Sequence, residues 1–452
     1  MSPFEKSPRG KLLARARPQV QQRVSARGER GSRHERAVRN AAFASEKREH
    51  ESRSYSRSCG TNAASEVLRK DVMTCNKAIA EAVRLCDVDV IAAYPITPQT
   101  SIVEYLAEFV AKKEIDAEYM KVESEHSALS ALVGASAAGA RTFTATSSQG
   151  LILMSEVMFT ASGMRLPIVM ANANRALSAP LNIWNDQQDS IAVRDSGWIQ
   201  FYAENNQEAL DYVVQCYKIS ENKKVMLPSM VNLDGFYLTH TLEPTEIPDK
   251  EDVKKFLPPY EPEYYLNPES SLTFGFFAGP ESYEEFRYEQ QKAMENAERA
   301  IKEVAKDYYG LTGRKYSAIE EYKLKDIVLL TIGSVSGTVK EVADKLEKEY
   351  SVGVAKLRMF RPFPFEEIRR IASGAKIIGV IEKDVIIGVD QGVVATEIKN
   401  ALYNSKSRVP VLSFIVGLGG RDTPPSTIEK IIKICDASIE KPEKESYWMD
   451  LK

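Results

Sequence analysis

The sequence predicts an α/β protein with two doubly wound, mostly parallel sheets and a disordered N-terminal extension. Short apolar runs alternate with amphipathic stretches at helical spacing along residues 68–242, and again along residues 326–445. Strands that alternate with helices favour parallel sheets with helices on both faces. The hydrophobic fraction is 43% over 452 residues. A chain of this length and composition can build more than one large core.

The N-terminal extension, residues 1–67, has a different composition from the rest of the chain. It carries 15 Lys and Arg against 7 Asp and Glu and has few large apolar residues, so we expect it to be disordered. It resembles a transit peptide only in part, because transit peptides are poor in acidic residues. A basic arm that contacts nucleic acid and a wrongly assigned start codon are the alternatives.

The apolar runs place the predicted strands, with helices between them. Those of the first block are 88–93, 118–122, 142–146, 168–171 and 225–234. Those of the second block are 326–332, 352–357, 376–381 and 411–416. Between the blocks, residues 243–325 form a predicted linker and helical insertion. Residues 243 to about 265 are rich in Pro, Glu and Tyr and are the predicted linker, and residues 281–308 form a predicted charged helix.

Composition argues against several classes of function. A formal net charge of −3 gives no whole-chain case for binding nucleic acid. No run of 18 apolar residues is present to span a membrane. The cysteines lack the close spacing of zinc or iron–sulfur ligands, so we expect free thiols in a reducing cytoplasm. They are Cys59, Cys75, Cys86, Cys216 and Cys435.

Polar side chains follow two predicted strands of the first block. Thr97 suits a helix N-cap, and Pro98 suits the first helical position. Glu123 and Glu125 precede a helix in residues 124–140, where 12 of 17 residues are Ala, Ser or Gly. Because open α/β sheets bind ligands at the carboxyl ends of their strands, Thr97 and Glu125 are candidates for one site.

Each candidate also has a purely structural interpretation. The dipole of the helix alone could explain Glu125, and small residues in the helix serve close packing. The turn Thr146-Ser-Ser-Gln-Gly150 either binds an anion or is a plain turn. Arg175 follows another strand, and its guanidinium either clamps a substrate carboxylate or forms a surface ion pair.

Three further features are weaker. Gly333-Ser-Val-Ser-Gly337 opens a helix but lacks the full dinucleotide fingerprint, so phosphate binding and a structural turn both remain open. Gly417-Leu-Gly-Gly-Arg-Asp422 is either a tight turn or part of a contact with a partner. Trp184 and Trp198 flank a polar stretch and line either a pocket, a subunit interface or the core.

Several of these motifs occur in the order typical of one family. The sequence resembles the alpha subunit of multisubunit 2-oxoacid:ferredoxin oxidoreductases, most closely the pyruvate type, from about residue 68 to the C-terminus. The motifs that carry the resemblance are Ala93-Tyr-Pro-Ile-Thr-Pro, Val122-Glu-Ser-Glu-His, Thr146-Ser-Ser-Gln-Gly-Leu, Gly197-Trp-Ile-Gln and Gly417-Leu-Gly-Gly-Arg-Asp.

The resemblance implies a pyrimidine-type thiamine diphosphate-binding domain at 68–242 and a domain like the C-terminal domain of transketolase at 326–445. It implies that Glu125 hydrogen-bonds the aminopyrimidine ring of the cofactor. It also implies that Thr97 contacts the carbonyl end of the substrate and that Arg175 binds the substrate carboxylate. Glu123 takes no role, and no residue of this chain is expected to hold a metal.

The resemblance implies an enzyme that works only in a heteromeric complex. The chain lacks both a Gly-Asp-Gly motif for diphosphate and Mg²⁺ and a cysteine cluster for iron–sulfur clusters, so a beta subunit and gamma and delta (ferredoxin-like) subunits are expected to supply them. The implied reaction is that of pyruvate synthase, in which pyruvate and coenzyme A give acetyl-CoA and CO2 and ferredoxin is reduced. A branched-chain or 2-oxoglutarate enzyme, a noncatalytic scaffold and a transketolase-like component are the alternatives.

Overall fold

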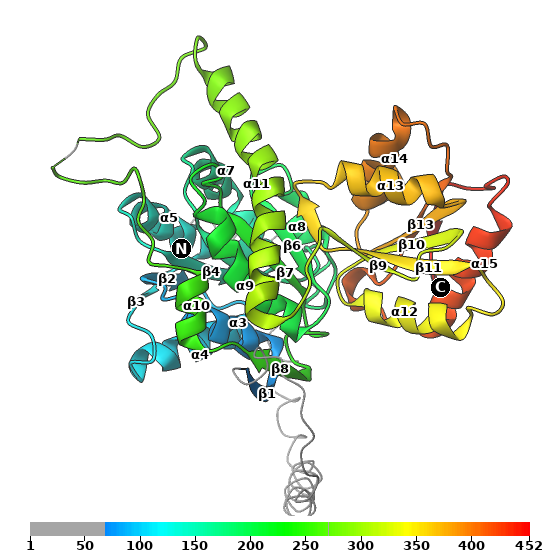
Figure 1. Ribbon diagram of the computed structural model, residues 1–452, viewed down its shortest axis with the longest axis horizontal. Helices are drawn as coiled ribbons and strands as arrows, with labels where there is room; N and C mark the ends of the chain where they lie inside the picture. Colours follow the sequence, from blue (N-terminus) through cyan, green and yellow to red (C-terminus); the bar gives the residue numbers. More distant parts are fainter. Residues whose placement is uncertain (1–67, 270) are drawn as a thin grey trace, which may run out of the picture. The chain divides into compact units, whose positions relative to one another are not determined.

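The computed structural model describes residues 68–269 and 271–452, and it shows two mostly parallel sheets, each covered by helices on both faces (Figure 1). This is the fold class that the alternating pattern predicts. The prediction of disorder for residues 1–67 lies outside the described residues. In the described part of the chain, every helix is too short or too polar to span a bilayer.

The first sheet has seven strands. In spatial order they are β12 (Met359–Arg361), β6 (Ile199–Ala203), β7 (Ser229–Asp234), β5 (Val169–Asn174), β4 (Thr142–Thr146), β2 (Val90–Ala93) and β3 (Glu118–Lys121). All neighbours run parallel except β12 and β6. Strands β4, β5, β6 and β7 are buried along their whole length, as expected for parallel strands covered on both faces.

Helices on the two faces of this sheet enclose two apolar cores. One core receives side chains from α3 (Cys75–Leu85), α4 (Thr100–Ala111), α9 (Asn206–Ser220), α10 (Lys250–Phe256) and α11 (Tyr283–Thr312). The other receives side chains from α5 (Glu125–Ala137), α6 (Ser148–Leu153) and α7 (Ser155–Gly163). The short helix α8 (Gln188–Ala192) follows the long loop after β5.

The second sheet has six strands. In spatial order they are β15 (Ser446–Trp448), β14 (Val411–Ile415), β13 (Ile377–Glu382), β10 (Ile327–Ile332), β11 (Val352–Leu357) and β9 (Ile319–Tyr322). Only β9 is antiparallel to its neighbour. One core lies under α12 (Val335–Lys345) and α15 (Pro425–Ala437), and the other lies under α13 (Phe365–Gly374) and α14 (Val393–Tyr403) (Figure 1).

The structure also contains strands that the sequence pattern did not indicate. Strand β6 lies in the core of the first sheet. Strands β1 (Arg69–Thr74) and β8 (Leu242–Ile247) form a separate antiparallel pair. The segment predicted as a Pro-rich linker therefore contains β8 and α10. Helix α10 is N-capped by Asp249, whose side chain accepts a hydrogen bond from the Glu251 N–H.

Strand β12 comes from the second half of the chain but pairs with β6 of the first sheet. Beside this junction, Lys356 is 1% exposed and lies among the carboxylates of Glu204, Glu208 and Glu320. Its Nζ is 2.7 Å from Glu208 and 2.6 Å from Glu320. Charged side chains from both halves of the chain are thus buried against one another.

Candidate functional site

The candidate site lies at the carboxyl ends of strands β2, β3, β4 and β5. These four strands are parallel, so the segments that follow them meet at one edge of the first sheet. Thr97, Glu125, the turn that begins at Thr146, and Arg175 follow these four strands in that order. This edge is where open α/β sheets bind their ligands.

Glu125 is the first residue of α5 and is 6% exposed. The Ser124 hydroxyl caps the helix by accepting a hydrogen bond from the Ser127 N–H at 3.2 Å. The Glu125 carboxylate thus lies at the N-terminus of the helix, where main-chain N–H groups are without intrahelical partners. Among the described residues no cation is paired with it, and the neighbouring His126 lies 4.0 Å from Glu156.

The Glu125 carboxylate lies over Gly150, in the first turn of α6. A methyl group at Gly150 would come within 2.5 Å of Glu125 Oε1 and 2.7 Å of Thr146 Oγ1. The Thr146 hydroxyl is buried and has no hydrogen-bond partner within the described residues. The buried Glu125 carboxylate and the Thr146 hydroxyl therefore lie so close to Gly150 that only glycine fits at this position. We call these three residues the Glu125 cradle.

Substituting Gly150 tests the function of this cradle. We expect Gly150→Ala to lower turnover by at least about tenfold, because displacing a positioned group by about 1 Å can cost up to about 100-fold. Steady-state assay of the assembled complex measures the effect. Gly163→Ala is the matched control, since Gly163 lies in a helix with nothing within 4 Å of an added methyl group. Normal turnover of Gly150→Ala would contradict a role for the cradle.

Arg175 is 8% exposed and is held by main-chain carbonyls. Its Nη1 donates to the Thr97 carbonyl at 3.0 Å, and its Nε donates to the Asn182 carbonyl at 3.0 Å. Burial lowers the pKa of this guanidinium, and the nearby Asp189 carboxylate acts in the opposite direction. The structure thus brings Arg175 and Thr97 together, and Arg175 forms no surface ion pair with any residue in 68–269 or 271–452, although such a pair was the alternative.

The prediction that Thr97 is an N-cap is wrong. Helix α4 begins at Thr100, its N-cap position is Gln99, and Thr97 lies exposed in the preceding turn, next to a cis peptide bond with Pro98. The turn is anchored instead by Gln99, whose Nε2 donates to the Tyr94 carbonyl at 2.7 Å and to the Ala145 carbonyl at 3.2 Å. Thr97 is therefore free to present its side chain at the strand end.

The two Gly-rich motifs in the second half of the chain serve contacts within the chain. Gly333 has a φ of 73° and lies against Gln187 and Asp234, which a side chain would strike. The N–H of Gly419 donates to Asp186 Oδ2 at 3.0 Å. Burial is the main factor that raises the pKa of Asp186 to about 7. Both motifs thus pack against the loop that follows β5.

The two tryptophans around that loop differ. Trp198 is fully buried, and its Nε1 donates to the Met158 carbonyl at 3.0 Å. Trp184 is 51% exposed, and it borders an open hollow of about 730 Å³ that is also lined by Asn182 and the turn at 418–421. Leu181 and Ile183 are exposed beside it. An apolar surface therefore lies next to the loop that holds Arg175.

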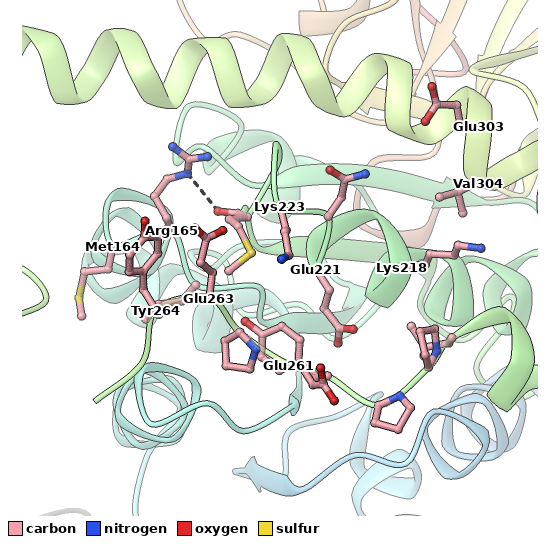
Figure 2. A pocket seen from close by; sticks show the side chains of 18 of the residues that line it. Met164, Arg165, Lys218, Glu221, Lys223, Glu261, Glu263, Tyr264, Glu303 and Val304 are labelled. Carbon is pink, nitrogen blue, oxygen red and sulfur yellow. Dashed lines mark hydrogen bonds between the residues drawn. The ribbon is translucent and has the colours of Figure 1, made fainter. Parts of the chain in front are cut away.

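Two other features are not candidate sites for chemistry. The carboxylates of Glu204, Glu208 and Glu320 lie close enough to hold a metal ion, but Lys356 already occupies the space among them. A cavity of about 610 Å³ lies between α9, α11 and the segment 257–264 (Figure 2). Its lining contains none of the strand-end residues.

Comparisons with known proteins find matches along most of the chain. The family model "Pyruvate flavodoxin/ferredoxin oxidoreductase, thiamine diP-bdg" matches residues 81–306, and "Pyruvate:ferredoxin oxidoreductase core domain II" matches residues 325–428. The chain is 53% identical to pyruvate synthase subunit PorA of Pyrococcus horikoshii over 389 residues, which are 85% of this chain and 98% of that protein.

Two further relatives extend the comparison. PorA of Methanothermobacter thermautotrophicus is 52% identical over 84% of this chain and 98% of its own length. Ketoisovalerate oxidoreductase subunit VorA of Pyrococcus horikoshii is 47% identical over 85% of this chain and 98% of its own length.

Among solved structures, a 2-oxoglutarate:ferredoxin oxidoreductase from Magnetococcus marinus, with 2-oxoglutarate, coenzyme A and succinyl-CoA bound, has a similar fold. Its TM-score is 0.64 at 19% identity, over 90% of this chain and 70% of that one.

Proposed function

Because the chain belongs to the pyruvate:ferredoxin oxidoreductase family, we propose that it is the alpha subunit of a pyruvate synthase. This enzyme oxidises and decarboxylates pyruvate with coenzyme A, giving acetyl-CoA and CO2, and it passes the electrons to ferredoxin. The observation that carries the choice of substrate is the 53% identity to a PorA subunit, against 47% to a VorA subunit from the same organism.

The residues at the strand ends suit thiamine diphosphate. Glu125 offers a buried carboxylate, and Gly150 leaves room for that carboxylate above the helix turn. Thr146 offers a hydroxyl that has no partner among the described residues. When bound, thiamine diphosphate supplies the nucleophilic carbon that adds to the carbonyl of a 2-oxoacid. The Glu125 carboxylate, at the N-terminus of α5, would accept a hydrogen bond from a protonated nitrogen of the cofactor's pyrimidine ring and would hold that proton in place.

Arg175 and Thr97 serve the substrate end. The guanidinium of Arg175 is fixed by two carbonyls and is a strong partner for a substrate carboxylate. Thr97 lies exposed in the turn whose carbonyl holds Arg175, so its hydroxyl is available to the substrate's carbonyl end. Together they orient the oxoacid, which brings its reacting carbon toward the cofactor.

Replacing Arg175 tests the substrate clamp. We expect Arg175→Ala to raise the KM for pyruvate by about tenfold or more, since a hydrogen bond to a charged group contributes about 1.5–3 kcal/mol. Steady-state kinetics of the complex provide the measurement. Arg165→Ala is a matched control, because Arg165 also binds two main-chain carbonyls, those of Val225 and Met226, but lines the cavity of Figure 2. Equal KM values for both variants would reject the clamp.

The remaining parts of the enzyme are assigned to partner subunits. We place Mg²⁺ and the cofactor's diphosphate on a beta subunit, and the iron–sulfur clusters on a ferredoxin-like subunit among gamma and delta. The exposed side chains of Leu181, Ile183 and Trp184 lie beside the loop that holds Arg175, and they support a subunit contact there. The first domain at 68–242 binds the pyrimidine half of the cofactor, and the domain at 326–445 is the transketolase C-terminal-like one.

A cytoplasmic location suits the thiols of the chain. Burial raises the pKa of Cys75, Cys86, Cys216 and Cys435, which keeps them protonated. All four are buried and free, as is usual in a reducing compartment.

A substrate panel tests the proposed function. The complex reconstituted with its partner subunits is assayed for ferredoxin reduction with coenzyme A and either pyruvate, 2-oxoisovalerate or 2-oxoglutarate. We expect pyruvate to have the highest kcat/KM. A preference for 2-oxoisovalerate would instead assign the chain to a ketoisovalerate enzyme. If none of the three substrates gives thiamine-dependent CO2 release, the chain would be a noncatalytic scaffold subunit.

A further inference from the structure

Asp189 connects the turns on which the candidate site is built. It lies in α8, and its side chain is fully buried. Its carboxylate accepts hydrogen bonds from five N–H donors on three segments of the chain. They are the main-chain N–H groups of Ser148, Arg175 and Ser190 at 2.9, 3.1 and 2.7 Å, and the side-chain amides of Asn172 and Asn174 at 3.4 and 2.7 Å.

One oxygen of this carboxylate bridges the two halves of the site. Asp189 Oδ2 accepts from the Ser148 N–H, in the turn after β4, and from the Arg175 N–H, directly after β5. The first turn carries Gly150, which lies against Glu125. The second carries the guanidinium that contacts the Thr97 carbonyl. A single acceptor oxygen thus fixes the distance between the turn beside Glu125, which is the proposed cofactor end of the site, and Arg175, which is the proposed substrate end.

The turn after β4 needs such an anchor. Ser148 has a φ of 51° and is fully buried, and the left-handed region is unfavourable for a residue with a side chain. The Ser148 hydroxyl donates to the Ala176 carbonyl at 2.6 Å, which is a second link to the segment after β5. Without Asp189, the turn could relax and withdraw Gly150 from its place below the Glu125 carboxylate.

The chemistry of the donors requires a carboxylate at this position. All five partners donate, and an ionised carboxylate is a pure acceptor with room for four or more hydrogen bonds. An asparagine would turn an NH2 group toward N–H donors and leave at least one of them without a partner. The structure contains no direct contact of Asp189 with the candidate catalytic side chains themselves, within the described residues, so its effect passes through the main chain.

We propose that Asp189 is a positioning residue that sets the geometry between the Glu125 cradle and the Arg175 clamp. The proposal rests on the proposed function, because both ends are assigned roles there. It predicts that losing the bridge weakens binding at both ends at once, although the Asp189 carboxylate bonds only to main-chain N–H groups and to the amides of Asn172 and Asn174 among the described residues.

The test compares Asp189→Asn with Asp211→Asn in the reconstituted complex. Asp211 is also a fully buried carboxylate with several donors, but it bonds to Tyr308, Arg314 and Tyr316. We expect Asp189→Asn to raise both the KM for pyruvate and the Kd for thiamine diphosphate by about tenfold or more. Asp211→Asn should lower thermal stability but leave both constants within about twofold of the wild type.

The outcomes separate the proposal from the proposed function. If the wild-type complex does not turn over pyruvate, the proposed function is wrong. The Kd for thiamine diphosphate in the two variants still tests whether Asp189 positions the turn after β4. Unchanged constants in Asp189→Asn, or equal changes in both variants, overturn the positioning role. If Asp189→Asn does not assemble, Asn174→Ala is the second variant; it keeps the carboxylate and removes the amide that donates to Asp189 Oδ1 and to Ser190 Oγ. It should raise both constants in the same direction by a smaller factor, and no change in either would overturn the proposal.

Discussion

Glu125→Gln is expected to lower pyruvate turnover by about 10²–10⁴-fold, the range that a positioned acid–base group contributes, and to leave the complex assembled. Glutamine has nearly the same shape, so the first turn of α5 and the cradle at Gly150 should persist. Its neutral amide cannot take part in the proton sharing with the pyrimidine ring that we propose for the carboxylate. Pyruvate-dependent CO2 release and ferredoxin reduction measure the loss, and size-exclusion chromatography verifies assembly.

Glu123→Gln is the matched control for this variant. Glu123 lies two residues earlier but is exposed, and its carboxylate accepts a hydrogen bond from the Ser127 hydroxyl. We expect its turnover to remain close to that of the wild type. If Glu125→Gln and Glu123→Gln have the same turnover, the carboxylate at 125 has no special role, and the assignment of the cofactor end fails.

Lys356→Met is expected to cause the largest loss of stability, about 3–5 kcal/mol, because it removes a buried cation from the buried carboxylate of Glu208. Lys356 is 1% exposed and contacts Glu204, Glu208 and Glu320. Lys340 and Arg358 contact some of the same carboxylates, so they compensate for part of the lost charge. The free energy of unfolding in denaturant and the thermal midpoint measure the loss.

The control for Lys356 is an exposed lysine. Lys345 forms a surface ion pair with Glu429 at 2.8 Å, and exposed ion pairs contribute little to stability. We therefore expect Lys345→Met to change the midpoint only slightly. A loss of stability in Lys356→Met no greater than in this control would show that the buried cluster does not hold the two halves of the chain together.

The effect of Lys356→Met should also depend on pH. Burial opposes ionisation of Glu320, but Lys356, Lys340 and Arg358 together lower the pKa of this carboxyl to about 2. A depressed pKa stabilises the fold above the unfolded value, near 4.5, and this contribution is lost as the pH falls toward 2. The stability difference between the wild type and Lys356→Met should therefore be largest at neutral pH and shrink below about pH 4.5.

The alternation of strands and helices was sufficient to predict the parallel sheets, because burial on both faces gives each strand a continuous apolar run. It missed β6, whose residues Ile199–Ala203 lie between a polar loop and a long helix and were recognised only as part of a motif. It could not assign β12 to the first sheet, since the strand comes from the second half of the chain. Local sequence does not encode such long-range pairing.

The positions of the candidate residues were predicted in part, and their roles remain predictions. Glu125 and Arg175 were singled out as polar residues at strand ends, and the structure places both at the carboxyl edge of the sheet. The cap at Thr97 was mispredicted, because Gln99 anchors the turn through carbonyls on two segments. Asp189 lies in a polar stretch with no motif of its own. Its role depends on donors at positions 148 and 175, which only the fold brings together.

The most direct test of the account is a structure of the assembled complex with thiamine diphosphate bound. We expect the Glu125 carboxylate to lie about 2.6–3.0 Å from a ring nitrogen of the cofactor's pyrimidine, the distance of a charge-assisted hydrogen bond. Gly150 should lie beneath that contact, as it does below the carboxylate here. A pyrimidine ring bound elsewhere, with Glu125 facing only protein, would contradict the central claim.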